Sequence, residues 1–288
     1  MMMTLYPVPP LMQSLATPPT ALFGIERLNR GYTGPMMRVR RASDSASLDC
    51  YSQADIVTHC VGSNGFVSYA YDQSGNGRYL SQATLSLQPK IYDSATGLIK
   101  VGRTAMLLFS KTTQTRLSFP SLLGIPPGSP AITTAVVAGD WADTSPPAAY
   151  QFGIGVNSSG DTVGENWAFG ISTGLLFLTS RIGTRRFTPA PSPATGRNSF
   201  VAYKALNADA SAWFLRQNRA LLVQASLVAG TMTLPTPQRG GEGAAWGSYA
   251  WTNQYTDAKS GLLGYWNAVL VGAELDALEQ FLERLRVQ

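Results

Sequence analysis

The carboxylates in loop-like segments are the residues of this 288-residue chain best suited to acid–base or nucleophilic chemistry. Hydrolysis of a glycosidic bond normally uses two carboxyl groups, about 5–5.5 Å apart for retention of configuration and about 6.5–9.5 Å apart for inversion. One candidate is Glu242, in the glycine-rich segment RGGEG. The other candidates lie in the middle of the chain and are Asp140, Asp143, Asp161 and Glu165. Acids in such loops are usually just solvated, so these positions define no catalytic pair by themselves.

Histidine and cysteine offer little further chemistry. His59 is the sole histidine, and Cys50 and Cys60 are the two cysteines. One His-Cys pair supplies too few ligands for zinc, and a nucleophilic triad would depend on His59 alone. We therefore expect no catalytic residue of this type, no metal and no cofactor. Free, semi-buried thiols are expected, with a disulfide as the alternative.

Aromatic residues gather in the segment AAWGSYAWTNQY, residues 244–255. Aromatic rings stack on the apolar faces of sugars, and amide side chains bond sugar hydroxyls. The candidate glycan-binding residues are Trp246, Tyr249, Trp251, Asn253 and Tyr255. Core packing and contact with another subunit are open alternatives for this cluster. Trp213 and Trp266 lie inside strand-like patterns, so we expect them in the core.

The segment YDQSGNG, residues 71–77, predicts a tight turn after an alternating strand. Asp and Asn bond the backbone two residues on, and Gly supplies the positive φ of a sharp reversal. Asp72, Gln73, Ser74 and Asn76 therefore predict a self-bonded structural turn. Calcium is the alternative occupant, but four small polar residues supply too few charged ligands for a tight site.

Composition favours an all-β protein. Charged residues make up 14% of the chain, with 28 Gly and 18 Pro, which suits short strands joined by turns. The net charge is +5, and the basic clusters are small, so we expect no nucleic-acid partner. No apolar segment approaches the ~20 residues of a membrane span. The first twenty residues lack the basic start and apolar run of a signal peptide, which predicts a protein made in the cytoplasm.

Short strand patterns recur along the chain. Residues 1–20 predict an extended, proline-punctuated arm, either disordered or docked on a neighbouring subunit. Apolar spacing at residues 273–286 predicts a helix packed on the sheet, with partner binding as the alternative. Strands are expected at residues 100–109, 132–139, 150–156, 167–171, 175–179, 200–206 and 262–270, with a hairpin across 217–219.

Three stretches together resemble a known module. They are RLNRGYTGPMMRVRRASDSASLD (Arg27–Asp49), GFVSYAYDQSGNGRYLSQATLSLQPKI (Gly65–Ile91) and GYWNAVLVGAELDALEQFLERL (Gly264–Leu285). They resemble a module of bacteriophage virion proteins with a laminin G-like, or concanavalin A-like, β-sandwich. The YDQSGNG element is also similar to one in the catalytic domain of fungal arabinofuranosidase B, which shares that sandwich.

The resemblance to the arabinofuranosidase implies a nucleophilic Glu on an inner strand and an Asp on a later glycine-rich loop. The strand that matches the first, AAYQFGIGV, has Gln151 where the carboxylate is wanted. A neutral amide can neither form a glycosyl-enzyme nor act as a base. We therefore expect no enzyme activity.

The resemblance implies one concanavalin A-like (laminin G-like) β-sandwich or jelly roll over residues 21–288, with the arm at 1–20 and one C-terminal α-helix. The expected function is a non-enzymatic structural protein of the bacteriophage virion, either a tail fibre or adhesin subunit or a capsid decoration protein. It would form homo-oligomers, contact other virion proteins through its arm and bind a host surface glycan. The alternatives are a glycoside hydrolase of arabinofuranosidase type, using Glu242 and a second, unidentified group, and a free lectin.

Overall fold

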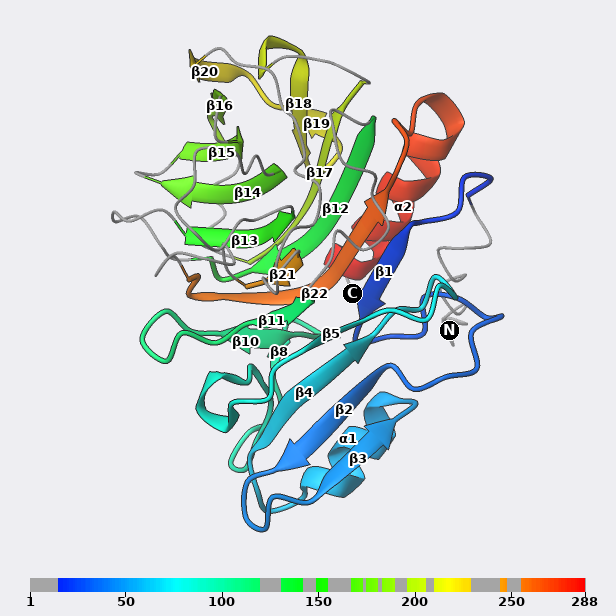
Figure 1. Cartoon of the computed structure of the whole chain (residues 1–288), viewed down its shortest axis with the longest axis vertical. Helices are drawn as coiled ribbons and strands as arrows, with labels where there is room; N and C mark the ends of the chain where they lie inside the picture. Colours follow the sequence, from blue (N-terminus) through cyan, green and yellow to red (C-terminus); the bar gives the residue numbers. More distant parts are fainter. Residues whose placement is uncertain are drawn as a thin grey trace, which may run out of the picture.

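The computed structural model describes residues 15–119, 131–141, 149–154, 167–172, 175–180, 183–189, 196–205, 210–228, 244–247 and 255–287. Antiparallel strands dominate these residues, and the two α-helices lie at their periphery (Figure 1). The strands join into one network that folds over into two layers, so the expected all-β sandwich is confirmed. Among the described residues, no helix has the length and apolar character needed to cross a membrane.

The first layer is centred on β22 (Ala258–Trp266), the longest described strand. It pairs on one edge with β12 (Ile132–Gly139) and on the other with β1 (Ala21–Gly24) and β10 (Leu107–Phe109). Beyond β12 follow β17 (Arg197–Lys204), β18 (Trp213–Gln217) and β19 (Ala220–Leu221). Beyond β10 follow β6 (Lys90–Asp93), β4 (Gly65–Tyr71), β2 (Met37–Arg41) and β3 (Ser47–Cys50).

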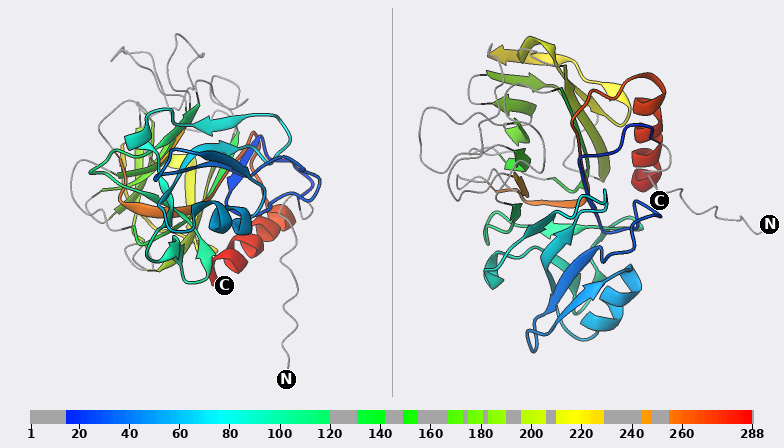
Figure 2. Two further views of the ribbon diagram at one scale, coloured as in Figure 1. Left: turned by 90° about the horizontal axis from the view of Figure 1, so that it is seen from below. Right: turned by 45° about the vertical axis from the view of Figure 1, so that its right-hand side comes forward.

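The second layer begins where β4 also pairs with β5 (Tyr79–Ser81). It continues through β11 (Leu117–Phe119), β21 (Ala244–Trp246), β13 (Ala149–Ile154), β14 (Trp167–Ser172), β15 (Leu175–Ser180), β16 (Gly183–Phe187) and β20 (Gln224–Val228). The short strand β7 (Gly97–Leu98) pairs with β6, while β8 (Lys100–Val101) and β9 (Thr104–Ala105) form a separate hairpin. Single 3-10 turns lie at η2 (Leu85–Leu87) and η3 (Ala210–Ala212). Figure 2 shows the stack β13–β16 facing the first layer.

Aromatic side chains hold the two layers together. Trp167 on β14 meets Trp213 on β18 edge to face, with ring centroids 5.4 Å apart. Phe152 on β13 meets Tyr265 on β22 in the same way at 5.7 Å. Such pairs add about 0.5–1.5 kcal/mol each beyond the burial of their area. Trp213 and Trp266 are fully buried, so their expected place in the core is confirmed.

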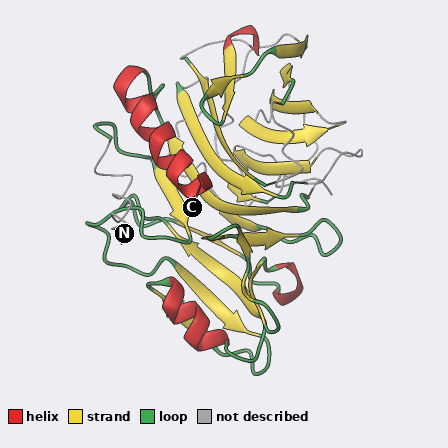
Figure 3. Ribbon diagram, turned by 180° about the vertical axis from the view of Figure 1, so that it is seen from behind, coloured by secondary structure: helices red, strands yellow, loops and turns green. Residues whose placement is uncertain are grey.

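The helices cover the outside of the first layer. Helix α2 (Gly272–Val287) packs against β17 and β12 through buried apolar residues, as Figure 3 shows from behind. Its polar anchors are buried as well: the Glu279 carboxylate, 2% exposed, accepts a 2.6 Å bond from Arg216 on β18. Helix α1 (Gln53–Cys60) begins with a capping box in which Ser52 and Asp55 each bond the other's backbone N–H.

Two expected strands differ from the structure. The pattern at residues 100–109 is broken into β8, β9 and β10, because Gly102 turns the chain with a φ of +59°. The last strand spans residues 258–266 instead of 262–270, and its extra length pairs with β10. In both places the boundary is set by a turn or by a partner strand, and the local apolar pattern shows neither.

Residues 1–14 of the expected arm lie outside the described part. Within the described part of the arm, the Thr17 N–H donates to the Glu274 carboxylate of α2 at 2.6 Å.

Both cysteines are free thiols in the core, Cys50 at the end of β3 and Cys60 at the end of α1. Burial raises the pKa of Cys50 to about 12, with the charge of Asp55 adding to the effect, and burial also raises the pKa of Cys60. A thiol with a raised pKa yields little thiolate at neutral pH. We expect both to react with Ellman's reagent about 100-fold more slowly in the folded protein than in urea. Equal rates in the two conditions would contradict their burial.

Candidate functional site

The Asp72 carboxylate holds the turn that follows β4. It is 1% exposed. Its Oδ1 accepts bonds from the backbone N–H of Leu22 at 2.9 Å and of Ser74 at 2.8 Å, and its Oδ2 accepts from the Ser74 hydroxyl at 2.8 Å. Burial raises the pKa of Asp72, while these bonds act in the opposite direction. The side chain thus links the turn to β1, fifty residues earlier in the sequence.

Gln73 and Asn76 extend this link. The fully buried Gln73 amide donates to the carbonyls of Gly24 and Glu26 and accepts from the Leu28 N–H at 2.8 Å. Asn76 donates to the carbonyl of Thr20 at 3.0 Å. The four turn residues of the sequence analysis are therefore brought together, bonded to one another and to residues 20–28. Within the described residues no cluster of three or more His, Cys, Asp or Glu forms a metal-binding group.

The aromatic segment is described only in part. Trp246 is fully buried on β21, where its indole N–H donates to Ser260 at 2.9 Å. Tyr255 is 7% exposed and accepts a 3.0 Å bond from Arg116, whose guanidinium also lies over its ring. Tyr249, Trp251 and Asn253 lie outside the described residues. The two described members are thus held by bonds within the chain.

The strand matched to the arabinofuranosidase nucleophile carries a β-bulge at Gln151. Tyr150 pairs with Gly170 and Phe152 with Phe169, which leaves Gln151 as the unpaired extra residue. Bulges re-aim a strand and are over-represented beside active sites. On its other edge β13 pairs with β21, where Ile154 lies opposite Ala244. Ala244, the first residue of β21, follows Glu242 by two residues in the sequence.

Of the remaining carboxylate candidates, Asp140 is the one that lies among the described residues. Asp140 forms an ion pair with Lys259 at 2.7 Å and is 45% exposed, as expected for a solvated acid. Asp143, Asp161, Glu165 and Glu242 lie outside the described residues.

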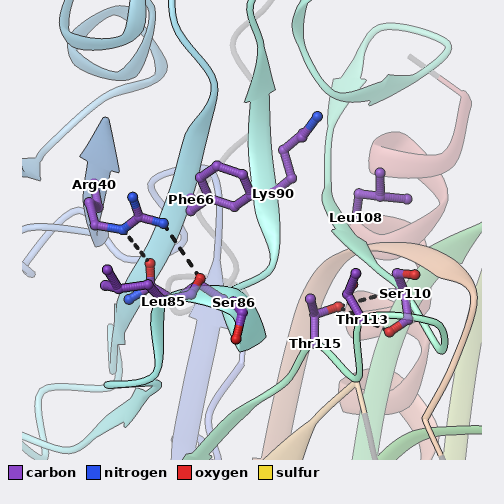
Figure 4. A pocket seen from close by; sticks show the side chains of 10 residues that line it. Arg40, Phe66, Leu85, Ser86, Lys90, Leu108, Ser110, Thr113 and Thr115 are labelled. Atoms are coloured by element: carbon purple, nitrogen blue, oxygen red, sulfur yellow. Dashed lines mark hydrogen bonds between the residues drawn. The ribbon is translucent and has the colours of Figure 1, made fainter. Parts of the chain in front are cut away.

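A cavity of about 520 Å³ opens on the first layer, away from β13, and the sequence analysis did not single it out (Figure 4). Its lining includes Arg40, Phe66, Lys90, Leu108 and Thr113. The local sequence offers one faint signal, the alternation of arginines at positions 38 and 40 on a strand whose pattern predicts half-exposure. The other lining residues come from distant segments, so no local pattern could assemble them.

Comparison with known proteins finds sequence similarity to an arabinofuranosidase. No protein-family model matches the chain. Over 76 residues the chain is 40% identical to alpha-L-arabinofuranosidase B of Penicillium canescens, a match that covers 23% of this chain and 16% of that protein. The matched region is thus a small part of the fungal enzyme.

Solved structures of arabinofuranosidases share the fold. A GH54 α-L-arabinofuranosidase soaked with a cyclic sulfate inhibitor superposes with a TM-score of 0.65 at 13% identity, covering 96% of this chain and 64% of that one. An arabinofuranosidase complexed with arabinofuranosyl-alpha-1,2-xylobiose gives a TM-score of 0.61 at 14% identity, with the same coverage. This chain therefore spans just under two thirds of the length of those structures.

These similarities overturn the expected function. The expectation of a non-enzymatic bacteriophage protein, whether tail fibre, adhesin or capsid decoration, is wrong, because the similar proteins are arabinofuranosidases. The expectation that the chain is not an enzyme is wrong on the same ground. It relied on the amide at Gln151 and on the interpretation of the remaining carboxylates as solvated loop residues. The chain shares the antiparallel β-sandwich of GH54 arabinofuranosidases across almost its whole length.

Proposed function

We propose that this chain is a glycoside hydrolase of arabinofuranosidase type, built on a concanavalin A-like sandwich and acting on α-L-arabinofuranosides. The observation that carries the proposal is the pairing of β13 with β21. It places a bulged strand, matched by sequence to the strand of a catalytic Glu, beside β21, whose first residue follows Glu242 by two positions in the sequence. Sequence similarity to arabinofuranosidase B and the common fold support the same assignment.

The chemistry follows from the residue types. Glu242 is proposed as the general acid that gives its proton to the glycosidic oxygen as the bond to the sugar breaks. The amide of Gln151 cannot form a covalent glycosyl-enzyme. We therefore propose direct attack by water, deprotonated by a second carboxylate, which inverts the anomeric configuration. Asp143, Asp161 and Glu165 are the candidates for that second group.

The test is hydrolysis of 4-nitrophenyl α-L-arabinofuranoside by the purified chain, followed by the release of 4-nitrophenol. The α-L-arabinopyranoside is the matched control, because it has the same leaving group and a different ring. We expect cleavage of the furanoside and little of the pyranoside. NMR of the first product should show the inverted anomer. Tight binding of the furanoside without cleavage would replace the hydrolase by a sugar-binding module, and neither binding nor cleavage would overturn the proposal.

A further inference from the structure

Four side chains form a row across four neighbouring strands and make the floor of the cavity. Arg40 on β2 lies opposite Phe66 on β4, Phe66 lies opposite Lys90 on β6, and Lys90 lies opposite Leu108 on β10. Residues directly opposite in antiparallel strands point to the same face of the sheet. Figure 4 shows Phe66 between the two cations. The guanidinium of Arg40 lies 5.0 Å and the ammonium of Lys90 lies 6.0 Å from the centre of the Phe66 ring.

The two walls of the cavity differ in their chemistry. Near Arg40, the turn η2 contributes Leu85 and Ser86. Across the floor, the loop after β10 contributes the hydroxyl-bearing residues Ser110, Thr113 and Thr115. Thr115 already accepts a 2.6 Å bond from the Ser110 N–H, which fixes the shape of that loop. The cavity thus offers a floor in which Arg40 and Lys90 alternate with the apolar Phe66 and Leu108, and one wall lined by hydroxyls.

Arg40 is a buried cation without a carboxylate partner among the described residues. It is 9% exposed, and its Nε donates to Gln88 at 2.8 Å while its Nη2 reaches the Leu85 carbonyl at 3.5 Å. Nη1 makes no hydrogen bond within the described part of the chain. Neighbouring Arg38, by contrast, is neutralised by a two-bond pair with Asp49. Burial lowers the pKa of Arg40, as expected for a charge that lacks a counter-ion. Lys90 contacts Asp93 at 3.0 Å, so Arg40 is the main anchor for an anion.

We propose that this cavity binds a uronate, a sugar residue that carries a carboxylate, within an acidic glycan. The planar guanidinium suits a carboxylate, which it can meet with two parallel bonds. The C–H face of the sugar ring would pack on Phe66 and Leu108, and its hydroxyls would meet Ser110 and Thr113. A volume of about 520 Å³ lies within the range of small-ligand pockets. An inorganic phosphate would use the cations but leave the apolar floor unfilled, so the glycan is favoured.

None of the residues that line the cavity lies on β13 or β21, and a binding measurement tests the cavity independently of the proposed hydrolysis. Isothermal titration calorimetry with the full chain would compare trigalacturonate, its neutral methyl ester and inorganic phosphate. We expect trigalacturonate to bind, the methyl ester to bind about tenfold or more weakly, and phosphate to bind weakly without displacing it. Equal binding of the methyl ester, or displacement of trigalacturonate by phosphate at equal concentration, would overturn the proposal.

Variants locate the binding. Arg40→Gln and Lys90→Gln are each expected to weaken trigalacturonate binding, the first about tenfold or more. Lys100→Gln is the matched control, because it removes the same charge from an exposed position on β8, outside the lining of the cavity. Lys90 is only half-buried, so its variant tests the site even if Arg40→Gln fails to fold. Equal weakening by Lys100→Gln would show a non-specific effect of net charge and overturn the assignment.

Discussion

Replacement of Glu242 by glutamine is expected to slow the hydrolysis of methyl α-L-arabinofuranoside, whose alkoxide leaving group needs a proton, by about 10²- to 10⁴-fold. The amide keeps the size of the side chain but has no acidic proton to give to the glycosidic oxygen. Initial rates at saturating substrate should show the loss in kcat, with KM changed little, because the proton is transferred in the transition state. A leaving group that needs no protonation would restore part of the rate.

Two further variants serve as controls for the Glu242→Gln measurement. Glu283→Gln makes the same chemical change on α2, where Glu283 pairs with Arg286, and should leave the rate unchanged. Gln151→Glu places a carboxylate at the β13 bulge and should raise the rate and retain the anomeric configuration, since a nucleophile becomes available. A wild-type rate in Glu242→Gln would exclude Glu242 from the reaction. Unchanged product configuration in Gln151→Glu would place the bulge away from the sugar.

Removal of the Asp72 carboxylate is expected to destabilise the fold strongly. Asp72→Ala leaves the N–H groups of Leu22 and Ser74 without their acceptor, at a cost of about 3 kcal/mol in the free energy of unfolding. Asp72→Asn is the matched control: its amide oxygen can accept the same two bonds, so we expect a loss below about 1 kcal/mol. Urea unfolding followed by tryptophan fluorescence measures both. Equal losses in the two variants would show that charge, and not the acceptor, matters.

The difference in the free energy of unfolding between wild type and Asp72→Asn should change with pH in a definite direction. Burial raises the pKa of Asp72 in the folded state above its unfolded value. The folded protein then holds the proton at pH values where the unfolded chain has released it, so the stability contributed by protonation is lost as the pH rises through the folded pKa. Wild type should therefore gain stability relative to Asp72→Asn as the pH is lowered through that value. If Asp72→Asn instead became more stable relative to wild type as the pH is lowered, this result would contradict the burial of the Asp72 carboxylate.

The functional prediction failed at a specific step. The segment YDQSGNG and the C-terminal helix were matched to a sandwich shared by virion modules and an arabinofuranosidase, and these elements do not distinguish the two. The choice between them depends on Gln151 and on the lack of a recognisable carboxylate pair in the sequence. Because the hydrogen bonds of Asp72 and Gln73 tie the turn to residues 20–28, this motif indicates the fold and not the function. Over almost the whole chain, the fold is that of the GH54 arabinofuranosidases.

The sequence by itself determined the features that depend on local chemistry. These features follow from residues that are close together in the sequence. They are the short strands separated by Gly and Pro, the turn at residues 71–77 and the apolar stripe of α2. Only the tertiary structure decided which strands are neighbours, because a period-2 pattern gives the face of a residue and not its partner. The row Arg40, Phe66, Lys90 and Leu108 and the pairing of β13 with β21 join residues far apart in the chain. Both proposed sites therefore arise from long-range strand register.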